Sequence, residues 1–290
     1  LRPLVDAPAV PVIHAADYLG HRPRILGADH ITVIGSGQSG AEVFLDLLRA
    51  RPTGRERLTW LTRTPSFAPR EHSTLGLEHF TPDYTRYFHS LPEPVRDQLV
   101  PTQAQLHKGI DPATLAAIHH ELYTRTLHGG WPDIVLTPGV TVRTAGRVAT
   151  TKVELHLEHP HQGTRSRLTT EAVVLATGYR DRPLSRLLAG LDPYLHKDSS
   201  GRPRVDEHHR MVLAPTVSGS IFVHSAERRT HGAGTPDLGL TTRRSATILN
   251  TLTGKNAYPE PARTTFTTFG LEQREQTRPP VELLPLIECP

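Results

Sequence analysis

The pattern of apolar and polar positions along the chain predicts an α/β protein. An apolar run at Ile31–Ile34 is followed by a helical repeat of apolar positions over 41–51 and by a second apolar run over 58–62. This order predicts a βαβ unit, in which the strands are parallel and the crossover is right-handed. A third apolar run over 172–175 leads into a turn and predicts a further strand.

The rest of the pattern predicts helices, a loop-rich insertion over about 65–110 and an antiparallel meander. Asp111, followed by Pro112, is typical of a helix N-terminus, and Gly129 and Gly130 of its end. The other expected elements are short helices over 82–89 and 94–100, a helix over 112–127 with Leu115, Ile118, Leu122 and Tyr123 inward, strands over 140–148, 152–158, 168–170 and 220–224, and a helix over 238–252 with Ile248, Leu249 and Leu252 inward and Gly254 at its end.

These elements suggest a Rossmann-like domain and part of a second domain. We expect residues 1–23 to be a linker or remnant, 24–175 the dinucleotide-binding domain, 176–255 a return to the second domain, and 256–290 an extended or disordered tail. The sequence opens at Leu1 in a proline-rich stretch, which suggests either a truncated product or an incomplete sequence.

The turn after the first strand carries the clearest chemical signal. It reads Gly-Ser-Gly-Gln-Ser-Gly, a complete G-x-G-x-x-G between a strand and a helix. The first glycine allows a tight turn, the second lets backbone approach a pyrophosphate, and the third lets helix and strand pack closely. The helix N-terminus favours phosphate, whereas the alternative is a glycine-rich turn without a ligand. The expected cofactor contacts here are Gly35, Ser36, Gly37, Gln38, Ser39 and Gly40.

The residue after the second strand favours NADP over NAD. An NAD-binding unit usually has an acidic residue there to hold the ribose 2′-hydroxyl, but this chain has Arg63 between Thr62 and Thr64. A guanidinium matches the charge and geometry of a 2′-phosphate. The alternative is that Arg63 is an ordinary solvated loop residue.

Composition narrows the classes of function. The net charge of +4 is dispersed without a Lys/Arg run, which gives no support to nucleic-acid binding. The single Cys289 excludes an internal disulfide and a multi-cysteine metal site, and the paired histidines lack metal-ligand spacing, so we expect no metal. No apolar run approaches the ~18–20 residues of a membrane span, and we expect a cytoplasmic protein.

Four stretches in order give the chain a family resemblance. They are 35–42, the segment Leu-Glu-His-Phe-Thr-Pro at 77–82, Leu-Ala-Thr-Gly-Tyr at 175–179, and His-Gly-Ala-Gly-Thr-Pro-Asp-Leu-Gly-Leu at 231–240, followed by Arg-Ser-Ala at 244–246. Together they resemble the L-lysine/L-ornithine N-hydroxylases of siderophore biosynthesis. The likeness extends over about residues 10–255 and is strongest to the lysine N6-hydroxylase branch, which includes diamine hydroxylases.

The resemblance implies a flavoprotein monooxygenase with FAD and NADPH as cofactors. In that family NADPH reduces FAD, reduced FAD captures O₂ as a C4a-hydroperoxide, and a neutral side-chain amine attacks the distal oxygen. The flavin carries the chemistry, so no catalytic side chain is assigned. The partners implied are a small amine and O₂, and a homo-oligomer is left open. The implied contacts are Thr177, Gly178, Tyr179, Leu238, Gly239 and Leu240 for the cofactors, and Lys108 and His107 for the substrate.

Three departures from the family pattern keep an alternative open. The glycine-rich FAD motif is absent from the 34 residues before Gly35, His107 stands where the family often has tyrosine, and Thr242-Arg243 stands where it has Ala-Trp. The alternative is an NADP-binding remnant without monooxygenase activity. A disulfide-reductase type of enzyme needs a cysteine pair, which one cysteine cannot supply. The amine, whether lysine, ornithine, cadaverine or putrescine, is left open.

Overall fold

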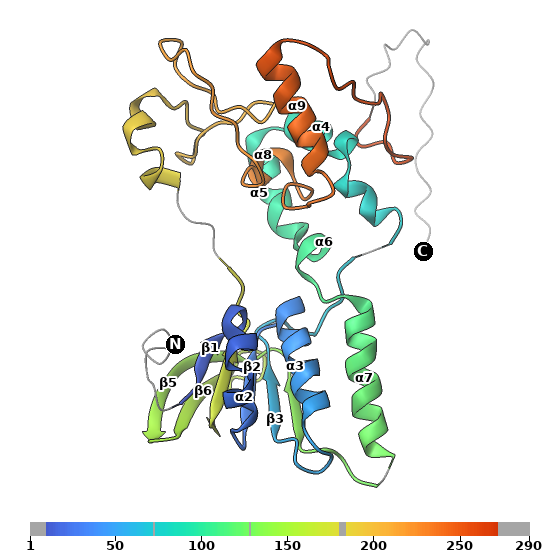
Figure 1. The fold of residues 1–290 in the computed structure, drawn as a ribbon, viewed down its shortest axis with the longest axis vertical. Helices are drawn as coiled ribbons and strands as arrows, with labels where there is room; N and C mark the ends of the chain where they lie inside the picture. The colour runs from blue at the N-terminus through green and yellow to red at the C-terminus, as the bar shows by residue number, and fades with distance from the viewer. Residues whose placement is uncertain (1–9, 72, 128, 180–183, 272–290) are drawn as a thin grey trace, which may run out of the picture.

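A computed structural model describes residues 10–71, 73–127, 129–179 and 184–271. Its elements form two halves (Figure 1). In the part of the chain that the structure describes, the sheet half contains strands β1 to β8 together with the helices α2 (Tyr18–Leu26), α3 (Gln38–Ala50) and α7 (Pro112–Thr126). The helical half contains residues 76–108 and 184–271, two segments far apart in the sequence that lie side by side.

A five-stranded parallel sheet forms the centre of the sheet half. Across the sheet the strands are β1 (Val12–His14), β8 (Ala172–Leu175), β2 (Ile31–Ile34), β3 (Leu58–Leu61) and β4 (Ile134–Thr137). Ile31 of β2 is in register with Leu58 of β3 on one side and with Ala172 of β8 on the other. The predicted parallel βαβ unit is confirmed, with α3 (Gln38–Ala50) as its crossover helix.

Two helices and a meander cover the faces of this sheet. α3 buries Phe44 and Leu47, and the Phe44 ring stacks on Trp60 of β3 at 4.8 Å. α7 (Pro112–Thr126) packs beside it through Leu115, Ile118 and Leu122. These positions repeat every three or four residues, so Tyr123 lies off the buried stripe, and its predicted inward position is wrong.

The antiparallel meander packs on the β1–β8 side of the sheet. It consists of β5 (Thr141–Ala149), β6 (Lys152–His159) and β7 (Thr164–Thr170). Val153 and Leu155 of β6 share a buried cluster with Val12 and Val173 of the parallel sheet. The predicted α/β class and its meander are confirmed.

The expected linker over 1–23 is wrong for its described part. Residues from Val12 onward form β1, the 3₁₀ turn η1 (Ala15–Asp17) and α2 (Tyr18–Leu26). β1 has only three residues, too few to show a strand period after Pro11, but it pairs with β8 at Val12↔Val173. The Tyr18 hydroxyl donates to Asp46 of α3 at 2.6 Å, which ties α2 to the core.

Short helices dominate the helical half. The predicted helices over 82–89 and 94–100 are confirmed as α4 and α5, whereas the predicted strand over 220–224 is reduced to one bridge between Phe222 and Arg210. The elements are η2 (Gly76–Phe80), α4 (Pro82–Ser90), α5 (Glu93–Thr102), α6 (Ala104–Lys108), η3 (Leu184–Arg186), η4 (Ala189–Tyr194), α8 (Arg228–His231) and α9 (Thr241–Thr253).

One further expectation fails in this half, and the tail is described only in part. Leu249 and Leu252 of α9 are exposed, and the buried side chain of that helix is Arg244. The expected extended tail is anchored at one point, since Glu78 accepts the backbone NH groups of Phe266 and Thr267 at 2.9 and 2.8 Å, whereas the side chains of Phe266 and Leu271 are exposed. Hydrogen bonds to carboxylates hold this segment, and apolar patterning does not report such bonds. Residues 272–290 lie outside the described part.

Among the described residues, none of the helices is both long and apolar enough to span a bilayer. In that same part of the chain, no three His, Cys, Asp or Glu side chains converge as metal ligands would.

A buried ion pair between α7 and the loop before β3 generates a stability prediction. Arg125 donates to the fully buried Glu56 at 2.8 Å and also to the Arg51 carbonyl at 3.1 Å. We expect Arg125→Leu to lower the free energy of unfolding by about 3–5 kcal/mol, because it leaves a buried carboxylate unpaired. Urea titration measures the change. Arg147→Leu, on exposed β5, is the control and should stay within about 0.5 kcal/mol; an equal loss in both would contradict the assignment.

Candidate dinucleotide-binding site

The β2–α3 turn packs directly against the end of β8. Gly35 has a φ of +141°, and a Cβ added there would lie 2.1 Å from the Ala176 carbonyl oxygen. A Cβ at Gly40 would lie 2.8 Å from the Gly35 carbonyl oxygen. Any larger residue at either position would push the strand, turn and helix apart.

The middle of the turn is open. A Cβ at Gly37, the N-cap of α3, would meet no atom within 4 Å, and no side chain caps the helix. Among the described residues, the backbone NH groups of Ser36, Gly37, Gln38 and Ser39 have no hydrogen-bond partner. Unpaired NH groups at the positive end of a helix suit a phosphate group.

A cofactor contact was predicted for Gln38, but its side chain makes hydrogen bonds within the protein. Its Oε1 accepts the backbone NH of Asp111 at 2.7 Å, and its Nε2 donates to Thr114 at 3.1 Å and to Glu42 at 2.9 Å. These bonds tie the start of α7 to the start of α3. The side chain is therefore committed, and only the backbone of Gln38 remains for a ligand.

Arg63 follows β3 at the same edge of the sheet. Thr62 is buried, and its hydroxyl lies 2.8 Å from that of Thr64, which fixes the backbone on both sides of the arginine. The Arg63 side chain is exposed and makes no hydrogen bond or ion pair with the described residues. A free guanidinium thus stands one strand away from the glycine turn.

Thr177, Gly178 and Tyr179 follow β8 on the other side of β2. The Ala176 NH donates to the Ile34 carbonyl at 2.8 Å, so this segment leaves the sheet beside the glycine turn. Gly178 has a φ of +77°, and the Tyr179 side chain is 80% exposed. The carboxyl ends of β3, β2 and β8 point towards the helical half (Figure 1). In open α/β sheets a nucleotide usually binds in the crevice outside these strand ends.

The remaining predicted cofactor residues lie in the helical half. Leu238 is 83% exposed, the Gly239 NH donates to the Asp237 carboxylate at 2.6 Å, and α9 begins directly after Leu240. The structure therefore divides the predicted set, and 238–240 do not join the glycine turn.

Sequence reasoning missed the residue that organises this loop. Arg244 is buried and donates to the carbonyls of Thr235 at 2.7 Å, Asp237 at 3.0 Å and Gly234 at 3.3 Å. Arg244 begins the Arg-Ser-Ala segment at 244–246 that resembles the family, and this resemblance was the one sequence signal for it.

The predicted substrate residues His107 and Lys108 end α6. Arg228 of α8 donates to Nε2 of His107 at 3.1 Å, and burial together with Arg228 and Lys108 lowers the pKa of His107. Because Arg228 is a donor, Nε2 accepts, so this ring edge is already occupied. Lys108 is exposed.

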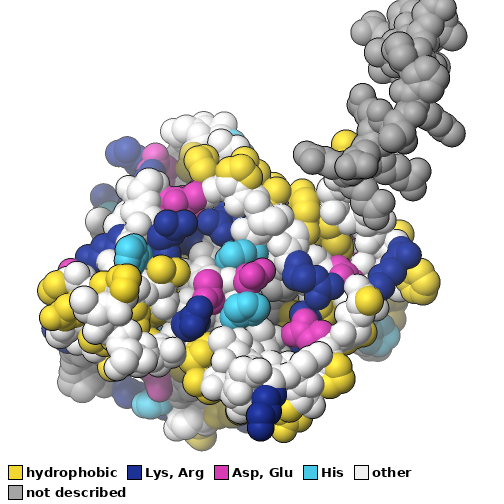
Figure 2. Space-filling view, turned by 90° about the horizontal axis from the view of Figure 1, so that it is seen from above, with side chains coloured by type: hydrophobic (Ala, Val, Ile, Leu, Met, Phe, Trp, Pro, Cys, Tyr) yellow, Lys and Arg dark blue, Asp and Glu magenta, His cyan; other side chains and the backbone are white. Residues whose placement is uncertain are grey.

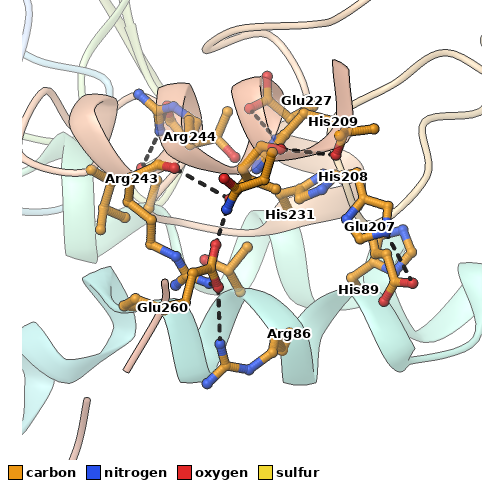
Figure 3. Close-up of a pocket in the computed structure, with 18 of the residues that line it drawn as sticks. Arg86, His89, Glu207, His208, His209, Glu227, His231, Arg243, Arg244 and Glu260 are labelled. Carbon is orange, nitrogen blue, oxygen red and sulfur yellow. Dashed lines mark hydrogen bonds and ion pairs between the residues drawn. The ribbon is translucent and has the colours of Figure 1, made fainter. Parts of the chain in front are cut away.

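A cavity of about 670 Å³ lies between α4 and α9. Figure 2 shows histidine and oppositely charged side chains gathered on this face. In Figure 3, Glu260 lies between Arg86 and Arg243, with which it pairs. The charges of Arg86 and Arg243 are thus balanced by a carboxylate, whereas Arg244 donates to loop carbonyls.

Two buried histidines lie in the cavity wall. His209 is buried, with Nδ1 3.1 Å from the Glu227 carboxylate. Its ring stacks on that of His231 at 4.2 Å. Burial, with the neighbouring His209 and His89 rings, holds the pKa of His231 well below its usual value.

The fold and the glycine turn together define a dinucleotide-binding α/β protein. The comparison with known families is consistent with this class: residues 3–181 match the family model described as L-lysine 6-monooxygenase/L-ornithine 5-monooxygenase. The chain belongs to this family.

Individual relatives agree with the family. A putrescine N-hydroxylase of Shewanella oneidensis is 36% identical over 89% of this chain. An L-lysine N6-monooxygenase of Escherichia coli is 32% identical over 89% of it. The FAD-bound structure of DfoA, a cadaverine monooxygenase of Erwinia amylovora, matches 91% of the chain with a TM-score of 0.82 and 34% identity. The chain covers only 50%, 60% and 60% of these three proteins, respectively.

The buried His231 generates a pH prediction. A histidine held neutral by the fold binds its proton more readily when unfolded, so stability is retained above its ordinary pKa of 6.5 and lost as pH falls below it. Between about pH 7 and pH 5 we expect the free energy of unfolding to fall, with His231 contributing up to ~1.4 kcal/mol per pH unit. His231→Phe keeps a ring in the stack and should show a shallower slope in urea titrations. An unchanged slope would contradict this role.

Proposed function

We propose that the protein is a FAD- and NADPH-dependent monooxygenase that hydroxylates a primary amine of a diamine or of L-lysine for hydroxamate siderophore biosynthesis. This chain would supply the NADPH site. Family membership and the named activities of the relatives support the reaction class. The observation that carries the proposal is the open glycine turn with its unpaired NH groups, one strand away from the free Arg63 guanidinium.

The residues of this turn fit NADPH. The space above Gly37 leaves room for a pyrophosphate, and the backbone NH groups of residues 36–39 would hold it. Arg63 would bind the 2′-phosphate, with the Thr62–Thr64 hydroxyl pair fixing the backbone that carries it. When bound, NADPH would supply the hydride and FAD the oxygen activation. The protein's contribution is to orient these groups and to exclude water.

For FAD we propose Leu238, Gly239 and Leu240 as contacts. They lie where the loop held by Arg244 enters the uncapped N-terminus of α9, and Leu238 presents an apolar side chain that no described residue covers. The described residues contain one glycine-rich βα turn, and NADPH would occupy it.

The candidate amines are chemically related. The relatives are named for putrescine, cadaverine and L-lysine, which share a primary amine on an unbranched alkyl chain. We propose that the exposed Lys108 binds an anionic group, either the carboxylate of an amino-acid substrate or a phosphate of NADPH. His107 is a weaker candidate, because Arg228 already occupies its Nε2.

A second candidate function is NADP binding without hydroxylation. The described residues contain a single glycine-rich βα turn, and this observation favours it. The two functions differ in whether the protein binds flavin. The purified hydroxylase should carry stoichiometric flavin absorbance, and the NADP-binding protein should not.

Hydroxylamine formation tests the reaction. The purified protein with NADPH and FAD should convert at least one of cadaverine, putrescine, L-lysine and L-ornithine to a hydroxylamine, measured by colorimetric assay and mass spectrometry. A boiled sample is the control. NADPH oxidation that yields only hydrogen peroxide with all four amines would overturn the hydroxylase proposal and favour the second candidate.

The nucleotide preference tests Arg63. We expect Arg63→Ala to weaken NADPH binding by roughly 10–100-fold and NADH binding little, since the lost charge-assisted hydrogen bonds involve only the 2′-phosphate. Arg55→Ala removes an exposed arginine before the same strand and should change neither. Isothermal titration measures both nucleotides. Equal losses for NADPH and NADH would refute the role.

A further inference from the structure

We propose that His14 is a positioning residue of the dinucleotide site, which holds the Gly178–Tyr179 turn in place for the nicotinamide half of NADPH. The inference rests on the proposed function, because it takes NADPH as the ligand. It assigns a task to a segment whose sequence indicated only a linker.

His14 stands at the end of β1, in register with Leu175 of β8. Its Nδ1 accepts the Ala16 NH at 3.2 Å and so caps η1. In a neutral imidazole the accepting nitrogen carries no proton, so Nε2 carries it. Nε2 lies 3.4 Å from the Gly178 carbonyl oxygen and donates to it.

The same ring also contacts Tyr179. The two ring centroids are 5.1 Å apart with an angle of 66° between the planes, an edge-to-face arrangement. Tyr179 is 80% exposed. Among the described residues it has no other ring contact and no hydrogen bond. Within the described part of the chain, His14 is therefore the side chain that contacts this exposed ring.

The turn is held from two sides. Ala176 packs against Gly35 of the glycine turn, where an added Cβ would lie 2.1 Å from the Ala176 oxygen. On the opposite side His14 holds Gly178, whose φ of +77° is a conformation that glycine adopts readily. Without His14, the β2 side alone among the described residues would restrain 177–179.

The strand order assigns this turn to one half of the dinucleotide. Arg63 follows β3 on one side of β2, and the Gly178–Tyr179 turn follows β8 on the other. A dinucleotide with its pyrophosphate at the β2–α3 turn and its 2′-phosphate at Arg63 extends its other half towards β8. His14 therefore acts on the nicotinamide half, whereas Arg63 acts on the adenosine half.

Ligand fragments separate these two roles. Isothermal titration compares NADP⁺ with 2′,5′-ADP, which lacks the nicotinamide half, on the wild-type chain and on His14→Asn, His14→Gln and the control His120→Asn. Asparagine can still cap η1 but loses the ring and the Nε2 donor, whereas glutamine can place an amide NH near the Gly178 carbonyl. His120 is an exposed histidine of α7.

We expect His14→Asn to weaken NADP⁺ binding about three- to tenfold, the range for one neutral hydrogen bond, and to leave 2′,5′-ADP binding unchanged. His14→Gln should recover part of the NADP⁺ affinity, and His120→Asn should match the wild type. An unchanged NADP⁺ affinity in His14→Asn, or an equal loss for both ligands, would overturn the inference. A wild-type chain that binds neither ligand would instead overturn the proposed function.

Discussion

The site depends on one close approach between two strand ends. Gly35 at the end of β2 and Ala176 at the end of β8 lie so near each other that a Cβ on Gly35 would be 2.1 Å from the Ala176 oxygen. This contact brings the free NH groups of the α3 N-terminus and the Thr177–Tyr179 segment to one edge. The parallel register of β2 with β3 and β8 then places Arg63 on the far side of the same turn.

A second constraint joins the two halves of the molecule. The chain crosses between them near residues 69–70 and 109–110. There the backbone NH of Arg70 donates to the Ile110 carbonyl at 2.8 Å, and the backbone NH of Ile110 donates to the Ala68 carbonyl at 3.0 Å. Gly109 has no room for a side chain, since its Cβ would lie 2.2 Å from the Arg70 nitrogen. Gln38 connects this crossing to the glycine turn through the Asp111 NH. The dinucleotide edge and the base of the helical half are thus held by one network.

The outcome for particular residues shows where sequence reasoning stops. Long periodic elements such as α7 and the strands around the glycine turn were predictable, because a buried stripe leaves a repeat in the sequence. β1 was missed because three residues carry no measurable period. The buried side of α9 was assigned wrongly because its buried residue is Arg244, which is stabilised there by loop carbonyls and not by apolar packing.

By itself the sequence determined the α/β class, the βαβ unit, the glycine turn and the arginine beside it, because each depends on residues close together along the chain. Only the tertiary structure decided that the Gln38 side chain faces α7, that Arg228 occupies His107, and that His14 reaches the Gly178 carbonyl across 164 residues. Such contacts join distant segments. They are set by strand order and packing, which leave no local pattern in the sequence.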